Sequence, residues 1–235
     1  MSTHNQTARL AGFLYLLLIV SGIFSLMVVP SKLMAWDSAA QTFDNITNSL
    51  LLFKLGIVGG IFTFLSFLAL ALVLYKLLSP VNKTYAGIML VLVLVSIPIS
   101  FVNMLHKFSV LTLLGRPEYL SNLDTIQLQN EMMLHLEYYY NGIQLSEIFW
   151  GLWLLPFGYL VYKSGFLPKL LGTFLMVGCF GYLIDFLGEF LYPFYSKTAF
   201  SDFVSIPGTI GEFGICLWLL IMGTTKINWP KKSNS

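Results

Sequence analysis

The stretch LLLFKLGIVGGIFTFLSFLALALVLYKLL, residues 50–78, decides the fold class. Its charged residues are Lys54 and Lys76, and the rest is almost entirely apolar. A bilayer hydrocarbon core of about 30 Å is crossed by roughly 20 apolar residues in a helix. Because a backbone in lipid must satisfy its own hydrogen bonds, such a stretch folds as a helix. We therefore expect a transmembrane helix here.

Further apolar runs of similar length follow the same pattern. They occupy residues 10–30, 85–114, 143–162, 167–192 and 203–223. Of the 235 residues, 57% are hydrophobic and 10% are charged, whereas soluble domains carry about a quarter charged residues. The composition excludes a water-soluble fold. The sequence predicts an all-α protein, an integral membrane bundle of six transmembrane helices in a single domain, residues 1–235.

Positive charge gathers at one set of helix ends. If the N-terminus is cytoplasmic, eight of the 13 basic residues fall on the cytoplasmic side. They are Arg9, Lys76, Lys83, Lys163, Lys169, Lys226, Lys231 and Lys232. Since cytoplasmic loops are enriched in Lys and Arg, we expect both the N- and C-termini in the cytoplasm.

The connection between the third and fourth spans, residues 115–142, has apolar residues at helical spacing with acids between them. This pattern predicts an amphipathic outer helix that starts near Ser121 or Asp124. An interfacial helix is the preferred interpretation, and a lid over the bundle is the alternative. Glu131 and His135 lie one turn apart, which favours a solvated face over a pair of metal ligands.

Three carboxylates are expected at one depth inside the membrane. Counting from the cytoplasmic lysines, Glu147, Asp185 and Glu212 lie about 21–24 Å along their helices. Buried charges are costly unless they pair or face water. We therefore predict an outward-opening ligand-binding cavity lined by Lys54, Asn103, His106, Gln144, Glu147, Asp185, Glu189 and Glu212. A structural role stays open, in which Lys54 neutralises Asp185 or Glu212 and fixes the helix register.

No catalytic or metal-binding motif accompanies these residues. The chain lacks H-x-x-x-H, H-E-x-x-H, a G-x-S-x-G elbow, a P-loop and a dinucleotide fingerprint. Cys179 and Cys216 lie inside apolar runs without C-x-x-C spacing and indicate small core residues. We expect no metal ion or cofactor, and these absences favour a non-enzymatic role while leaving catalysis open.

Several segments resemble a known family. RLAGFLYL (9–16), FKLGI (53–57), FWGLWLLPFGYLVYKSG (149–165) and GYLID (181–185) are similar to small bacterial membrane proteins that carry the label domain of unknown function 4386. The resemblance implies the bacterial cytoplasmic (inner) membrane and supplies no activity. It also implies that Lys54, Asp185 and Glu212 form a polar network, because Glu147 falls where the family more usually has an amide.

The leading hypothesis is a protein that binds or transports a small polar or amphiphilic ligand. Its expected partners are membrane lipids and a small-molecule or lipid ligand, with no nucleic acid; its oligomeric state is open. One alternative is a metal-assisted intramembrane hydrolase acting on a lipid, with His106 as ligand and Glu212 or Asp185 as ligand or base. Another is a structural or regulatory partner of a membrane protein, which uses Gly56-x-x-x-Gly60 as its contact face.

Overall fold

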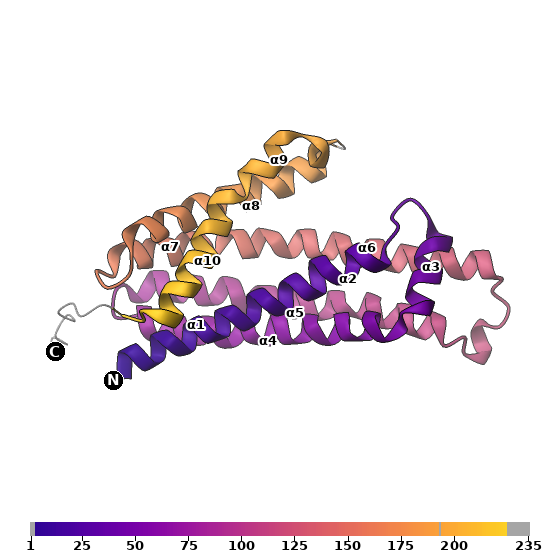
Figure 1. Cartoon of the computed structure of the whole chain (residues 1–235), viewed down its shortest axis with the longest axis horizontal. Helices are drawn as coiled ribbons and strands as arrows, with labels where there is room; N and C mark the ends of the chain where they lie inside the picture. The colour runs from indigo at the N-terminus through magenta and orange to yellow at the C-terminus, as the bar shows by residue number, and fades with distance from the viewer. Residues whose placement is uncertain (1–2, 193, 225–235) are drawn as a thin grey trace. The chain divides into compact units, whose positions relative to one another are not determined.

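The computed structural model describes residues 3–192 and 194–224 (Figure 1). Within these residues the secondary structure is helical throughout, and six helical segments are long and apolar enough to cross a membrane. The expectation of an all-α, six-span membrane bundle is confirmed for the described residues. Which termini face the cytoplasm stays a prediction.

The six segments follow the chain in simple order. The first consists of α1 (Thr3–Gly22), a π-helix (Ile23–Val28) and α2 (Val29–Leu33). The second and third are α4 (Leu50–Leu78) and α5 (Lys83–Leu114), and the fourth joins α6 (Thr125–Leu152) to α7 (Leu154–Lys163). The fifth is α8 (Lys169–Leu191), and the sixth joins α9 (Ala199–Val204) to α10 (Ile206–Ile221).

Local sequence chemistry sets the ends of the shorter elements. Ser38 begins α3 (Ala39–Asn48), and its hydroxyl accepts a hydrogen bond from the Gln41 backbone N–H at 3.2 Å. Thr198 caps α9 in the same way. Single 3₁₀ turns at Glu118–Leu120 and Tyr195–Lys197 complete the connections. Polar caps of this kind satisfy backbone N–H groups that a helix start leaves without partners.

The helix expected outside the membrane is present but is not separate from the fourth span. Asp124 caps it, because its carboxylate accepts from the Gln127 N–H at 2.8 Å while the Gln127 side chain accepts from the Asp124 N–H. The helix then continues past the expected boundary at residue 142 to Leu152. No proline interrupts it before Pro156, whose missing N–H coincides with the change from α6 to α7. The prediction of a separate interfacial helix is corrected on this point.

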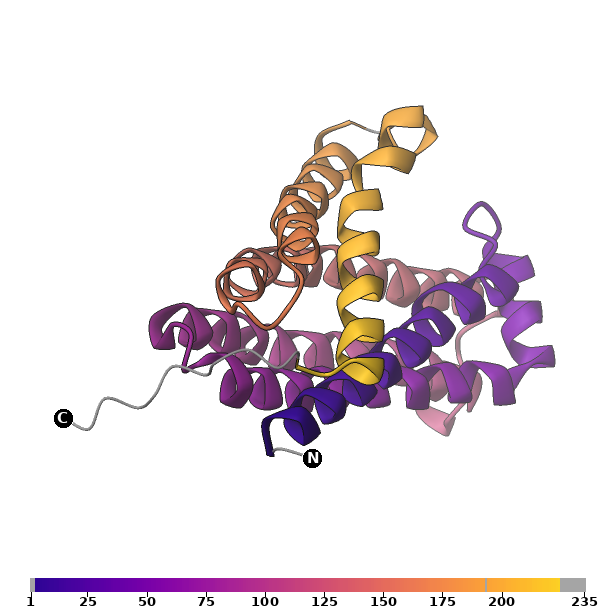
Figure 2. The ribbon, with the colours of Figure 1, turned by 60° about the vertical axis from the view of Figure 1, so that its left-hand side comes forward.

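Contacts between Cα atoms divide the chain into two compact units. The tyrosine unit takes the described residues of Met1–Leu16, Ser66–Ser96 and Glu147–Ser235. The histidine unit takes Leu17–Leu65 and Ile97–Ser146. We name each unit after the side chains that hold its polar site. Figures 1 and 2 show the ribbon of both.

The tyrosine unit is held together by closely packed helices. α8 contacts both α7 and α10 (Figures 1 and 2). Where α8 meets α10, a Cβ on Gly178 would overlap the backbone of Gly208, so the glycine is required for this approach. Trp153 is fully buried, and its ring stacks on Phe157 at a centroid distance of 5.0 Å. Small residues at helix contacts and buried aromatic rings are what close packing in a membrane demands.

The histidine unit has its own core of glycine contacts. A Cβ on Gly56 would lie 2.8 Å from the Val29 side chain, and one on Gly60 would lie 2.8 Å from Met104. Both glycines are buried. The Gly56-x-x-x-Gly60 face is therefore occupied within its own unit, which leaves the structural-partner hypothesis without the contact face that it used.

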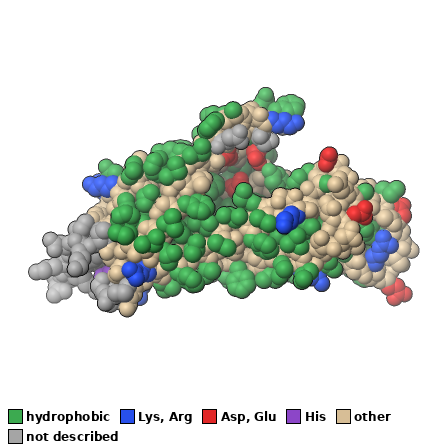
Figure 3. Space-filling view, viewed as in Figure 1, with side chains coloured by type: hydrophobic (Ala, Val, Ile, Leu, Met, Phe, Trp, Pro, Cys, Tyr) green, Lys and Arg blue, Asp and Glu red, His purple; other side chains and the backbone are tan. Residues whose placement is uncertain are grey.

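Apolar side chains also cover much of the outer surface. Figure 3 shows hydrophobic side chains over most of the face in view, with only scattered patches of charged side chains among them. Phe62 and Leu105, for example, are each 60% exposed. Such a surface is unfavourable in water and favourable against lipid tails.

Candidate functional site

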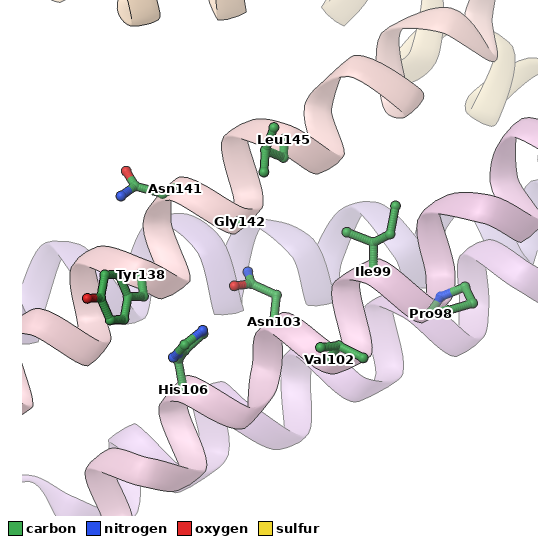
Figure 4. A pocket seen from close by; sticks show the side chains of 9 residues that line it. All are labelled: Pro98, Ile99, Val102, Asn103, His106, Tyr138, Asn141, Gly142 and Leu145. Carbon is green, nitrogen blue, oxygen red and sulfur yellow. The ribbon is translucent and has the colours of Figure 1, made fainter.

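A pocket opens between α5 and α6 within the histidine unit (Figure 4). Its volume is about 550 Å³, within the range of small-molecule sites. It is lined by Pro98, Ile99, Val102, Asn103, His106, Tyr138, Asn141, Gly142 and Leu145. It opens at the surface of the helices, since Val102 and Leu145 are 65% and 54% exposed.

The pocket's polar and apolar groups lie at different ends. In Figure 4, Tyr138, Asn141 and His106 lie toward one end and Pro98, Ile99 and Val102 toward the other, with Asn103 and Leu145 between them. This separation follows from the sequence of α5, which places Pro98, Ile99 and Val102 before Asn103 and His106 along the same helix. The pocket surface is therefore largely apolar, with a few polar side chains toward one end.

Asn103 is fixed in place by α6. Its amide nitrogen donates to the backbone carbonyl of Tyr139 at 2.8 Å, and the side chain is buried. A Cβ on Gly142 would overlap the Asn103 side chain, so only glycine leaves room for the amide there. The sequence predicted Asn103 as a ligand-binding residue, but it did not predict that the Asn103 side chain packs against Gly142.

Two histidines face each other beside the pocket. The Nδ1 atoms of His106 on α5 and His135 on α6 are 3.2 Å apart, and the ring centroids are 5.5 Å apart. The Tyr138 ring lies 5.4 Å from the His106 ring and 6.3 Å from that of His135. Of the two residues predicted on a solvated face, Glu131 is exposed, and His135 is half-buried and contacts His106.

A lysine that the sequence did not single out is buried in the same unit. Lys107 is 3% exposed, and its ammonium group lies 4.0 Å from the centroid of the Tyr139 ring. An ammonium over an aromatic face gains a favourable electrostatic interaction. Asn103 and Lys107, four residues apart on α5, both contact Tyr139. Residues four apart lie on one face of a helix. This spacing from Asn103 is the sequence feature that could have identified Lys107.

The tyrosine unit surrounds a carboxylate with phenols. Tyr15 on α1 donates to one oxygen of Glu212 at 3.0 Å, and Tyr182 on α8 donates to the other at 3.0 Å. The carboxylate of α10 thus joins three helices of one unit. Both oxygens of the Glu212 carboxyl group therefore have a hydrogen-bond partner within the unit.

The other acids of this unit lie near one another. Tyr195 donates to the Asp185 carboxylate at 2.7 Å. Glu147 is close enough to Glu189 and Asp185 for their charges to interact. Burial, and then the Asp185 carboxylate, raises the pKa of Tyr195 to about 12, because both disfavour the phenolate. Tyr195 therefore stays a hydrogen-bond donor at neutral pH.

The sequence-predicted residues divide between the two units. Asn103 and His106 line the pocket of the histidine unit; in the same unit, Gln144 is half-buried and Lys54 is exposed. The remaining four belong to the tyrosine unit: Glu147, Asp185, Glu189 and Glu212. That all eight line one cavity stays a prediction.

A metal centre needs several donor side chains that converge on one point. Among the described residues, no group of three or more His, Cys, Asp or Glu side chains is arranged to hold a metal ion. The acids around Glu147 therefore lack the convergence of a metal centre built from protein ligands.

Comparison with known proteins identifies relatives of this chain. The sequence profile described as "Domain of unknown function (DUF4386)" matches residues 10–223. A curated protein of Archaeoglobus fulgidus, described as uncharacterized, is 29% identical over 167 residues, which cover 71% of this chain and 83% of that protein. No solved structure matches the chain.

Proposed function

This chain belongs to the family described as domain of unknown function 4386, and it has six helical segments that can cross a membrane. From that premise we propose that it binds a small amphiphilic molecule in the pocket between α5 and α6. The observation that carries the proposal is the separation of polar and apolar groups within that one pocket.

The apolar end suits a hydrocarbon group. Val102 and Leu145, from α5 and α6, are exposed at the pocket, and Pro98 and Ile99 extend the same wall. A hydrocarbon chain laid there removes its own surface and that of the wall from water, at about 25 cal/mol per Å². In a bilayer the gain is smaller, since lipid tails compete for the same wall.

The polar end suits a head group that exchanges hydrogen bonds. Asn141 and Tyr138 offer an amide and a phenol, and His106 offers an imidazole. Hydrogen bonds from these side chains stabilise a bound head group most when the unbound head group would lie in lipid and not in water. A polar group without hydrogen bonds is costly in lipid. The pocket therefore favours an amphiphile over a purely apolar lipid tail or a fully polar solute.

The test is binding of a fluorescent monoacylglycerol to the full chain in lipid nanodiscs. Val102→Trp fills the apolar end and is expected to weaken binding at least about tenfold, the loss of roughly 1.4 kcal/mol. Leu105→Trp is the matched control, because Leu105 lies on the same helix, is 60% exposed and does not line the pocket. Equal affinity in the two variants would contradict the proposal.

The hydrolase alternative has less support. It requires Glu212 or Asp185 as a metal ligand or base. Both Glu212 oxygens accept from tyrosines, and Asp185 accepts from Tyr195. These contacts favour a binding function over hydrolysis.

We extend the proposal to location and orientation. The expected site is the bacterial cytoplasmic membrane with both termini inside; the archaeal relative suggests that the family also occurs in archaea. Lys226, Lys231 and Lys232 support the cytoplasmic C-terminus by sequence, although they lie outside the described residues.

A reporter fused after Ser235 should be active only in its cytoplasmic form. Activity of a periplasmic reporter there would reverse the topology.

A further inference from the structure

The contact between His106 and His135 fits two arrangements, an N–H···N hydrogen bond between neutral rings or a cation held by both nitrogens. Their Nδ1 atoms lie 3.2 Å apart, on helices α5 and α6. A neutral imidazole has one N–H and one acceptor nitrogen. One Nδ1–H can therefore donate to the other Nδ1, so that the pair shares a proton, or both Nδ1 atoms can face one cation as acceptors.

The distance also fits two ligands of one metal ion. A zinc–imidazole bond is about 2.0–2.1 Å long and zinc sites are tetrahedral. Two such nitrogens around one ion are then separated by about 3.3–3.4 Å, from the bond length and the tetrahedral angle. The observed 3.2 Å is within about 0.2 Å of that separation.

The two rings are also supported from different elements. His106 is held on α5, one turn after buried Asn103, and His135 is held on α6, one turn before buried Tyr139. Asn103 hydrogen-bonds the Tyr139 carbonyl, which ties the two helices together next to the histidines. Ligands presented from two joined helices keep their spacing without the ion, as a preformed site requires.

We propose that His106 and His135 bind one divalent transition-metal ion of the zinc class through their Nδ1 atoms. Imidazole suits Zn²⁺, Cu²⁺ and Ni²⁺, whereas Mg²⁺ and Ca²⁺ prefer oxygen ligands. With two protein ligands, the remaining coordination positions belong to water or to another small ligand. Because His106 lines the pocket, those positions are adjacent to it.

The experiment titrates the full-length protein in detergent with Zn²⁺, and with Co²⁺ as a coloured substitute. The expected result is one ion per chain, together with a rise in the thermal unfolding temperature, because an ion that binds the folded state stabilises it. His106→Gln and His135→Gln should each weaken binding by about 10- to 100-fold or more, since even outer-shell changes cost that much. His4→Gln is the matched control and should bind like the wild type.

The outcomes separate the two explanations of the contact. A pair that only shares a proton gives no Zn²⁺-dependent rise in the wild type, and that result overturns the proposal. Equal affinity in wild type, His106→Gln and His135→Gln overturns it as well, because the ion then binds elsewhere. If one glutamine variant fails to fold, the other variant and the wild-type thermal shift still decide.

Discussion

The two units treat polar groups inside a membrane protein in opposite ways. In the tyrosine unit, each oxygen of Glu212 accepts a hydrogen bond from a phenol, Tyr15 or Tyr182. In the histidine unit, buried Lys107 lies over a ring, and His106 and His135 face each other beside an open pocket. The first arrangement uses its polar groups to join helices, and the second leaves polar groups available to a ligand.

The difference shows that a buried charge alone does not identify a binding site. A carboxylate with full hydrogen bonding fixes the packing of the helices around it. A ligand would have to replace those bonds before it gained any interaction of its own. In the histidine unit, Asn103 and His106 already have partners, but Tyr138 and Asn141 are exposed at the pocket. A ligand reaches these two at a smaller cost, so the histidine unit is the better candidate for binding.

The largest expected effect concerns packing in the tyrosine unit. Gly178→Leu places a side chain where the Gly208 backbone lies, and we expect about 3 kcal/mol of destabilisation or loss of folded protein. Gly87→Leu is the control in the same unit, since a Cβ there meets nothing within 4 Å. Thermal unfolding in detergent measures both. Equal stability of the two variants would show that α8 and α10 are not in close contact.

The next effect concerns the phenols around Glu212. Tyr15→Phe and Tyr182→Phe each remove one donor, at a cost of about 1–3 kcal/mol. Because they share one carboxylate, the double variant should deviate from the sum of the singles. His135→Gln should change stability by less than either. The comparison between the units fails if His135→Gln is the more destabilising change.

A smaller effect depends on pH through Tyr195. Its pKa is raised from about 10 in an unfolded chain to about 12 in the fold. The stabilisation is therefore fully present below pH 10 and is lost as the pH rises through 12. Unfolding measured between pH 9 and pH 12 should show a fall in wild type that Tyr195→Phe lacks. If stability falls with pH equally in wild type and Tyr195→Phe, the hydrogen bond between Tyr195 and Asp185 is not the cause of the fall.

The smallest effect is expected at Lys107. Lys107→Met keeps the length of the side chain and its contact with the Tyr139 ring, and removes the cost of burying a charge. Stability should stay within about 0.5 kcal/mol of wild type or rise. A large loss in the urea or thermal midpoint would mean that the ammonium has a role beyond the ring contact.

The sequence predicted the class of the fold because that property is local. Apolar runs such as residues 50–78 are long enough for a membrane, whatever the rest of the chain does. Asn103 and His106 were also predicted, because polar groups inside apolar runs are visible without a structure. What each buried group contacts was not predictable in this way.

The missed contacts are distant in sequence or ambiguous in pattern. Tyr15 and Glu212 are 197 positions apart, and a tyrosine in an apolar run also fits a lipid-facing position. His135 was assigned to a solvated face because it lies one turn from Glu131 on the outer helix, and that spacing gives no sign of His106 on α5. Lys107 follows His106 near the end of an apolar run, where a lysine ordinarily reaches toward the membrane surface.

Helix α6 (Thr125–Leu152) has a consequence for how the protein can be reached from outside the lipid. Its 28 residues rise about 42 Å at 1.5 Å each, which exceeds the hydrocarbon thickness of about 30 Å. Because α7 adds further apolar residues to the same span after the break at Trp153, the first turns of α6 are expected to stand in the head groups or in water. We expect antibodies and proteases to reach the start of α6 from one side of an intact membrane.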